Sequence, residues 1–185
     1  MMKRLFDIVV TIMALLLLSP LMVLVSIFII VEDRGSPFFK QLRVGKGGEV
    51  FGIYKFRSMK ANAEKLGPYY TEKNDPRITK VGAFIRKTSI DELPQLINVL
   101  LGQMSIVGPR PDVPIQQANY TKEQWNARIS IKPGITGLAQ ATARSCATPE
   151  QRIQLDMKYI NNNNFMFDMK IILMTIKQII CKGGN

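Results

Sequence analysis

The chain has 185 residues, of which 46% are hydrophobic, so it can bury one compact core and is too apolar for a disordered or collagen-like polymer. It contains no histidine and only two cysteines, which excludes histidine-based catalytic triads, histidine-ligated zinc and a disulfide framework. The net charge of +11 predicts an anionic partner: nucleic acid, a phosphorylated small molecule or lipid headgroups. Any ionisable chemistry must come from Asp, Glu, Lys, Arg or Tyr.

The N-terminal segment is long and apolar. The 24 residues from Ile8 to Val31 carry no charge, and a helix needs about 20 apolar residues to cross a bilayer. A signal peptide also begins with basic residues such as Lys3 and Arg4, but its apolar core is only about 7–15 residues long and a small-residue cleavage site follows it. The segment therefore predicts a helix that stays in the membrane.

A Ser19-Pro20 pair lies near the middle of this segment, and proline kinks or breaks a helix because it removes a backbone donor. Basic residues flank the segment on both sides, so a straight span would place one basic flank outside the cell, against the usual charge bias. A re-entrant helix keeps both flanks in the cytoplasm, and the Ser19 hydroxyl would satisfy a freed backbone group. A kinked spanning helix is an equally compatible alternative.

The remaining residues, 35–185, hold 22 basic and 11 acidic residues, and a face this positive suits an anionic membrane surface. Two strand patterns, 37–44 and 50–56, flank a glycine-rich turn and predict a β-hairpin. Helix patterns follow at residues 57–66, 91–101, 122–129, 149–161 and 165–182. We therefore expect a mostly helical α+β fold with a short hairpin, whose last helix belongs either to the core or to the membrane interface.

The candidate chemistry centres on Asp91 and Glu92, at the start of a predicted helix. Ser89 and Glu92 have the spacing of a capping box, whereas a second register makes Asp91 the cap and places Pro94 where no helical bond is lost. In either register Asp91 lies at the positive end of the helix, where phosphate binds and a carboxylate stays ionised. Acidic residues are common at helix starts, so a purely structural cap is the commoner interpretation of this stretch alone.

Cations accompany this acidic pair. Arg86 lies five residues before Asp91, and Arg110 lies between two prolines that restrict its backbone, which suits bidentate phosphate recognition; an ordinary surface turn is the alternative. An aspartate can form a covalent acyl-phosphate, and nearby cations offset the repulsion between a carboxylate and a phosphate. The sequence thus permits phosphoryl transfer.

Four segments occur in order: YKFRSM (54–59), DELPQLINVL (91–100), MSIVGPRP (104–111) and KPGITG (132–137). With the Ser19-Pro20 segment, they make nearly the whole chain resemble the bacterial sugar transferases, the monotopic polyprenyl-phosphate phosphoglycosyl transferases. The resemblance implies that Asp91 attacks the sugar-bearing phosphate of a UDP-sugar, releases UMP and holds a covalent sugar-phosphate. Undecaprenyl phosphate would then displace Asp91, in the first membrane step of a glycoconjugate pathway.

The same resemblance implies a site and a location. Glu92 would complete a dyad by assisting proton removal or by holding Mg²⁺ with Asp91. Family positions that contact phosphates match Lys55, Arg57, Arg86 and Arg110. Residues 1–34 would form a re-entrant helix broken at Ser19 and Pro20, and residues 35–185 a catalytic domain with interfacial helices on the cytoplasmic face of the bacterial inner membrane. Larger members carry further transmembrane helices, so this chain resembles the minimal form.

Anionic membrane lipids are expected partners and nucleic acid is not, because no recognition motif accompanies the basic residues. The oligomeric state stays open, a homodimer included. Asp156 and Tyr159 match a frequent family pattern, and we interpret them as structural support. Two other classes remain as alternatives: a membrane-anchored, non-catalytic scaffold and a membrane-anchored, basic nucleic-acid-binding protein.

Overall fold

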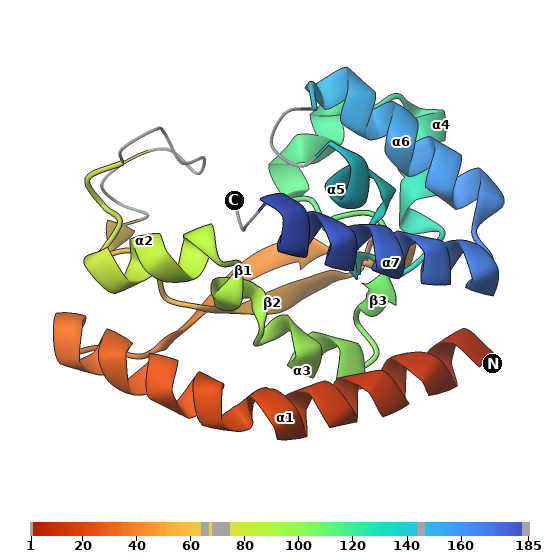
Figure 1. Cartoon of the computed structure of the whole chain (residues 1–185). Helices are drawn as coiled ribbons and strands as arrows, with labels where there is room; N and C mark the ends of the chain where they lie inside the picture. Colours follow the sequence, from red (N-terminus) through yellow and green to blue (C-terminus); the bar gives the residue numbers. More distant parts are fainter. Residues whose placement is uncertain (1, 64–66, 68–74, 144–146, 183–185) are drawn as a thin grey trace.

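The structure, a computed structural model, describes residues 2–63, 67, 75–143 and 147–182, with the side chains of 179–182 left out. The expected mostly helical α+β fold is confirmed. Helix α1 (Met2–Asp33) forms the base of the molecule, and its two ends rise toward the elements above it (Figure 1). The predicted membrane helix is therefore present, but it runs through Ser19 and Pro20 as one bent helix rather than a broken one.

Helix α1 is the one described helix that is long and apolar enough to cross a membrane. Its most apolar 18-residue window has a mean hydropathy of 2.9, and only 11% of that window is buried. Leu16 and Leu17, in the middle of the helix, are 72% and 80% exposed. The Ser19 hydroxyl donates to the Leu16 carbonyl at 3.0 Å, a bond back into the preceding turn. The helix thus presents a large apolar surface away from the rest of the protein.

The predicted hairpin is confirmed. Strands β1 (Phe38–Val44) and β2 (Val50–Phe56) pair antiparallel, with Val44 opposite Val50. The turn between them contains a short 3₁₀ segment, η1 (Lys46–Gly48), in which Gly47 and Gly48 have φ of 72° and 83°, a region that favours glycine. The alternating pattern of β2 buries Phe51, Ile53 and Phe56.

The residues after the hairpin do not form the expected helix over 57–66. Met59 instead pairs with Ile78 in an isolated antiparallel bridge, and Lys60 donates its backbone N–H to the Arg77 carbonyl at 2.8 Å; residues 64–66 lie outside the described part. Tertiary pairing therefore overrides the local helix propensity. Helix α2 (Lys80–Lys87), which the sequence patterns missed, begins at Thr79, whose side chain accepts from the Gly82 N–H.

The helix expected over 91–101 consists of two shorter elements. A 3₁₀ turn, η3 (Ile90–Glu92), precedes helix α3 (Gln95–Leu100), whose N-cap is Pro94. Ser89 adopts a left-handed conformation, with φ of 58°, and its side chain makes no capping bond. Both predicted capping registers are therefore wrong, because a separate 3₁₀ turn occupies residues 90–92 and α3 starts only after Pro94.

The upper part of the molecule contains a small parallel sheet and four helices (Figure 1). Strands β3 (Ser105–Val107) and β4 (Gly134–Thr136) pair parallel, with Ser105 opposite Gly134. Their connection contains a 3₁₀ segment and a predicted helix; a short helix that the sequence patterns missed follows β4, and two more predicted helices end the chain. These elements are η4 (Pro114–Asn119), α4 (Lys122–Ile129), α5 (Leu138–Thr142), α6 (Pro149–Asn162) and α7 (Phe165–Lys182).

Three groups of buried side chains hold these layers together. The upper core joins α5, α6 and α7 to β3, and Ile171 of α7 is fully buried in it. A second group packs the C-terminal half of α1 on the hairpin and α2 through Val25, Ile29, Phe56 and Ile85. A third joins β2 to α3. The predicted last helix therefore belongs partly to the core, although its other face leaves Met166 75% exposed.

Candidate active site

Glu92 is held between two cations. One of its carboxylate oxygens, Oε1, accepts from Lys55 Nζ at 2.8 Å and from Arg110 Nη2 at 2.6 Å. The side chain is only 18% exposed. Burial acts to raise the pKa of Glu92, but the charges and hydrogen bonds of Arg110 and Lys55 outweigh it and hold the pKa well below its ordinary value. Glu92 is therefore a fixed anion that orients the two cations.

Asp91 has the opposite environment. Within the described part of the chain, its carboxylate has no hydrogen bond or ion pair. Burial raises the pKa of Asp91 to about 6 and the charge of Glu92 acts in the same direction, although Lys55, Arg86 and Arg110 oppose them. Two adjacent carboxylates thus have pKa values displaced in opposite directions, a pattern typical of functional sites. The carboxylate of Asp91 is the one left available for a reaction.

The structure brings together most of the predicted site. Lys55 comes from β2 and Arg110 from the segment after β3, and both contact Glu92. Arg86, in the last turn of α2, acts on the charge of Asp91. Burial lowers the pKa of Lys55, and Glu92 acts to restore it. The site thus combines Lys55, Arg86 and Arg110 with the carboxylates of Asp91 and Glu92. These residues come from four separate segments of the chain.

Arg57 lies elsewhere. Its guanidinium forms an ion pair with Asp33, at the end of α1, with Nη2 and Oδ2 3.3 Å apart. It also covers Gly35, where an added Cβ would lie 2.2 Å from its Nη1. Arg57 therefore ties the end of α1 to the hairpin, and the structure gives it no contact with the Asp91–Glu92 pair.

The sequence analysis missed Arg43. This side chain lines a small pocket with Lys55, Gln95 and Arg110, and its Nη1 donates to the Pro111 carbonyl at 2.8 Å. Its buried Nε has no partner in the described part of the chain. Burial lowers the pKa of Arg43 to about 10, and the charge of Arg110 acts in the same direction. Strand periodicity could have identified this residue, because alternation along β1 places Arg43 on the half-buried face of the strand.

A buried ionic network supports the backbone of Arg110. Arg128 of α4 donates to the Arg110 carbonyl and forms ion pairs with Asp112 and Asp156, each at 2.5 Å. All three of these side chains are almost completely buried. Tyr120 adds a hydrogen bond to Asp112 at 2.8 Å. Asp156 therefore has a structural role, as expected: through Arg128 it helps to fix the segment that carries Arg110.

Helix α1 is tied to the same region at its N-terminal end. Lys3 donates to the Val107 carbonyl, to the Tyr159 hydroxyl and to Asp168, at 2.9, 3.0 and 2.5 Å. The buried Asp7 accepts from the Ser105 hydroxyl at 2.8 Å. These contacts join the membrane helix to β3, three residues before Arg110, and they explain the structural role expected of Tyr159.

The pair of carboxylates suits Mg²⁺ in donor type, since this ion binds one or two carboxylates together with substrate phosphates and water. No cluster of three acidic, histidine or cysteine side chains occurs among the described residues. Among the described residues Glu92 Oε2 accepts one long hydrogen bond, from Arg110 Nη1 at 3.4 Å, so this oxygen keeps capacity to bind an ion together with the Asp91 carboxylate. A magnesium site here would therefore depend on oxygens from the substrate.

These features define a class: a protein with a long, exposed apolar helix and a carboxylate pair beside a cluster of cations, a site suited to a phosphorylated substrate. The profile of the bacterial sugar transferase family matches residues 1–182. The chain belongs to this family, as the four sequence segments predicted.

Three relatives illustrate the family. The chain is 43% identical to galactosyl transferase CpsE of Streptococcus agalactiae and 42% identical to the sugar transferase EpsL of Bacillus subtilis, in each case over 98% of its length. It is 40% identical, over 95% of its length, to the UDP-glucose:undecaprenyl-phosphate glucose-1-phosphate transferase of Escherichia coli. The matches span 43%, 89% and 39% of these relatives, so the chain spans less than half of the first and third.

Proposed function

We propose that this chain transfers a sugar-1-phosphate from a UDP-sugar to undecaprenyl phosphate and releases UMP, in the first membrane step of a glycoconjugate pathway. The substrates in the names of its relatives support this assignment, since these include glucose, galactose and N-acetylgalactosamine phosphotransferases that act on undecaprenyl phosphate. The observation that carries the proposal is the contrast within the dyad. Glu92 is engaged by two cations, while the Asp91 carboxylate beside it has no hydrogen bond or ion pair to any residue that the structure describes.

In the proposed reaction, an Asp91 oxygen attacks the sugar-bearing phosphorus. The bond from this phosphorus to the bridging oxygen breaks, and UMP leaves with the bonding electrons. An oxygen of undecaprenyl phosphate then attacks the same phosphorus, and the carboxylate of Asp91 leaves. Lys55, Arg110 and Arg43 offset the charge that gathers on the phosphates in both steps. Mg²⁺ held by Asp91 and Glu92 would add further neutralisation of the diphosphate.

The acceptor is a lipid, so the dyad must lie at the level of the headgroups. We propose that α1 enters the inner membrane from the cytoplasmic face and returns to it, keeping residues 35–185 in the cytoplasm. Contacts at both ends of α1 support this topology. Lys3 and Asp7 bind the β3 region, and Asp33 pairs with Arg57, while the exposed middle of the helix is apolar.

The catalytic proposal is tested with Asp91→Asn in the full chain reconstituted with undecaprenyl phosphate. We expect UMP release from a UDP-sugar panel to be abolished, while Lys122→Gln, which removes an exposed cation of α4, keeps the wild-type rate. Without acceptor, intact mass should show one sugar-phosphate added to the wild-type chain and none to Asp91→Asn. Normal turnover by Asp91→Asn would overturn the proposal and leave a scaffold role.

The topology is tested separately with single cysteines, Met2→Cys and Ser36→Cys, after both native cysteines are replaced by serine. A membrane-impermeant thiol reagent applied to sealed vesicles should label both positions from the same side. Labelling from opposite sides would show that α1 spans the membrane, whatever the outcome for Asp91.

A further inference from the structure

A second cationic cluster lies at the opposite end of α3 from the dyad. Gly102 follows α3 with φ of 81°, and a Cβ added to it would lie 3.5 Å from Arg4 Nη2 and 3.6 Å from Lys132 Nζ. Two cations from distant parts of the chain therefore flank one glycine. Since α3 has six residues, this cluster is about 9 Å or more from the dyad.

Arg4 and Lys132 differ in the hydrogen bonds that they make. Arg4 donates to the Val99 and Leu100 carbonyls, at 2.5 and 2.8 Å, and so caps the C-terminal end of α3. The ammonium of Lys132 makes no hydrogen bond or ion pair within the described residues. Burial lowers its pKa, and the charges of Arg4 and Lys46 lower it further, while Asp7 opposes them. The cluster thus has an excess of positive charge that an anion would relieve.

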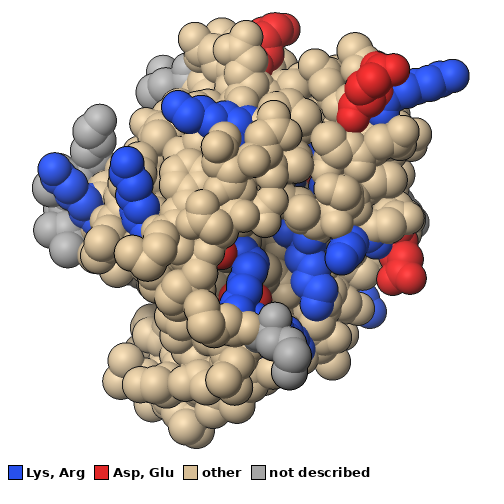
Figure 2. All heavy atoms as spheres, turned by 90° about the vertical axis from the view of Figure 1, so that its right-hand side faces the viewer, with Lys and Arg blue, Asp and Glu red and all other residues tan. Residues whose placement is uncertain are grey.

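Exposed apolar side chains adjoin the cluster along the chain. Leu101, next to Gly102, is 60% exposed, and Leu5, next to Arg4, is 64% exposed. Figure 2 shows the face at the N-terminal end of α1, where Lys and Arg side chains gather directly above an uncharged band along the bottom of the molecule. Because α1 forms this bottom, these side chains lie between the apolar helix and the polar part of the protein (Figures 1 and 2), and Arg4 belongs to the first turns of α1 itself.

We propose that Arg4, Gly102 and Lys132 form a binding site for the phosphate of an anionic phospholipid headgroup. The phosphate would lie on the solvent side of the two cations, where Gly102 adds no side chain, and the acyl chains would cover Leu101 and the exposed side of α1. Charge complementarity and this apolar rim favour a lipid over a free anion, which would leave the rim exposed. The site does not depend on the proposed reaction, since none of its residues contacts the dyad.

The test uses the full chain in neutral detergent, titrated with phosphatidylglycerol, phosphatidylcholine or inorganic phosphate. Native mass spectrometry counts the lipids that stay bound. We expect the wild-type chain to retain phosphatidylglycerol in preference to phosphatidylcholine. Lys132→Gln should weaken phosphatidylglycerol binding about fivefold, which corresponds to about 1 kcal/mol for one basic residue near an anionic surface. Lys132→Arg, which keeps the charge, should stay within about twofold of wild type by the same reasoning.

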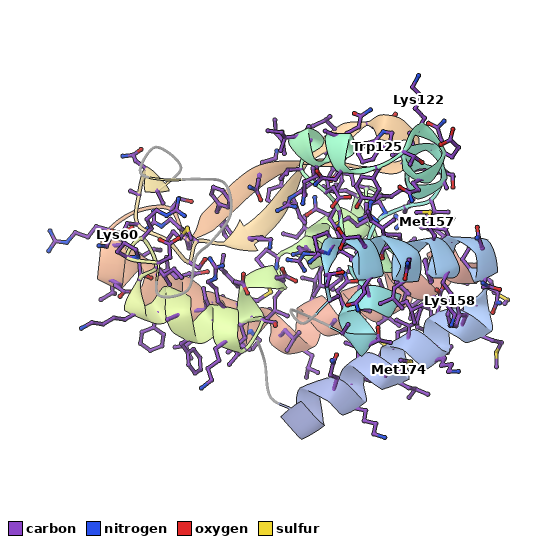
Figure 3. The ribbon with its side chains drawn as sticks, turned by 90° about the horizontal axis from the view of Figure 1, so that it is seen from above. Lys60, Lys122, Trp125, Met157, Lys158 and Met174 are labelled. Atoms are coloured by element: carbon purple, nitrogen blue, oxygen red, sulfur yellow. The ribbon has the colours of Figure 1, made fainter. Side chains whose placement is uncertain are left out.

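The matched control is Lys122→Gln, because Lys122 points away from the body of the protein at α4 (Figure 3) and its loss removes the same charge. Its phosphatidylglycerol binding should equal that of wild type, as should that of Asp91→Asn. The proposal is overturned if Lys132→Gln binds like wild type, if Lys122→Gln loses as much, or if inorganic phosphate competes with the lipid at equal concentration. Loss of UMP release in Asp91→Asn with lipid binding intact would separate this site from the catalytic proposal.

Discussion

Replacing Asp91 by asparagine should stabilise the protein while it removes the proposed nucleophile. The folded protein raises the pKa of Asp91 from 3.8 to about 6, so its charged form is disfavoured on folding. A shift of about two units corresponds to about 3 kcal/mol. A group whose pKa is raised on folding favours the folded state only while it is protonated, so this stability is lost as pH rises from 3.8 through about 6. Asparagine, which stays neutral, avoids the loss.

The measurement is thermal unfolding in detergent, followed by Trp125 fluorescence, at pH 4 and pH 7.5. Near pH 4 the two proteins should unfold at similar temperatures, and at pH 7.5 Asp91→Asn should unfold several degrees higher, since 1 kcal/mol is about 2–4 °C for a chain of this size. Glu92→Gln is the matched control with the opposite sign. This substitution removes the negative charge that pairs with Lys55 and Arg110. The variant should therefore unfold at a lower temperature at pH 7.5. An Asp91→Asn difference that does not change between the two pH values would refute the argument.

Three further outcomes follow from the same geometry. The rate of UMP release should fall as pH drops through about 6, where Asp91 becomes protonated; a flat rate between pH 5 and 7 would exclude it as the ionised group. Arg43→Gln should raise the KM for the UDP-sugar about tenfold, the loss of one charged hydrogen bond, whereas Lys122→Gln leaves it unchanged. Arg128→Ala should lower the free energy of unfolding by about 3–5 kcal/mol, measured by chemical denaturation, because Asp112 and Asp156 lose their buried partner.

The sequence predicted those elements whose signals are local. The hairpin has alternating strands around a glycine turn, and the helices at 122–129 and 165–182 have the bounds expected from their patterns. The predicted helix start near Asp91 was wrong because Ser89 has a left-handed backbone and a 3₁₀ turn occupies residues 90–92, so that α3 begins only after Pro94. Similarly, residues 57–63 have helix-forming side chains but take their hydrogen bonds from a segment about 18 residues later.

The residues of the candidate site were likewise predicted only in part. Four of the predicted site residues lie together because β2, η3 and the segment after β3 converge: Lys55 and Arg110 pair with Glu92, and Asp91 is its neighbour in η3. Arg57 was assigned to the site from its motif, yet its partner is Asp33, 24 residues earlier and at the end of the membrane helix. A motif identifies residues that occur together in the sequence. The ion-pair partner of a long basic side chain such as that of Arg57 depends instead on which elements pack beside it.

The contacts of α1 bear on how membrane insertion and the site are linked. Lys3 binds the Val107 carbonyl, and Val107 is followed two residues later by the Pro109-Arg110-Pro111 segment that holds Glu92. At its other end, Asp33 pairs with Arg57, two residues after Lys55, the second cation on Glu92. Each cation of the dyad is therefore close in sequence to an anchor of α1. A change in the bend of α1 would pull on both segments, so the membrane helix is part of the framework that positions the site.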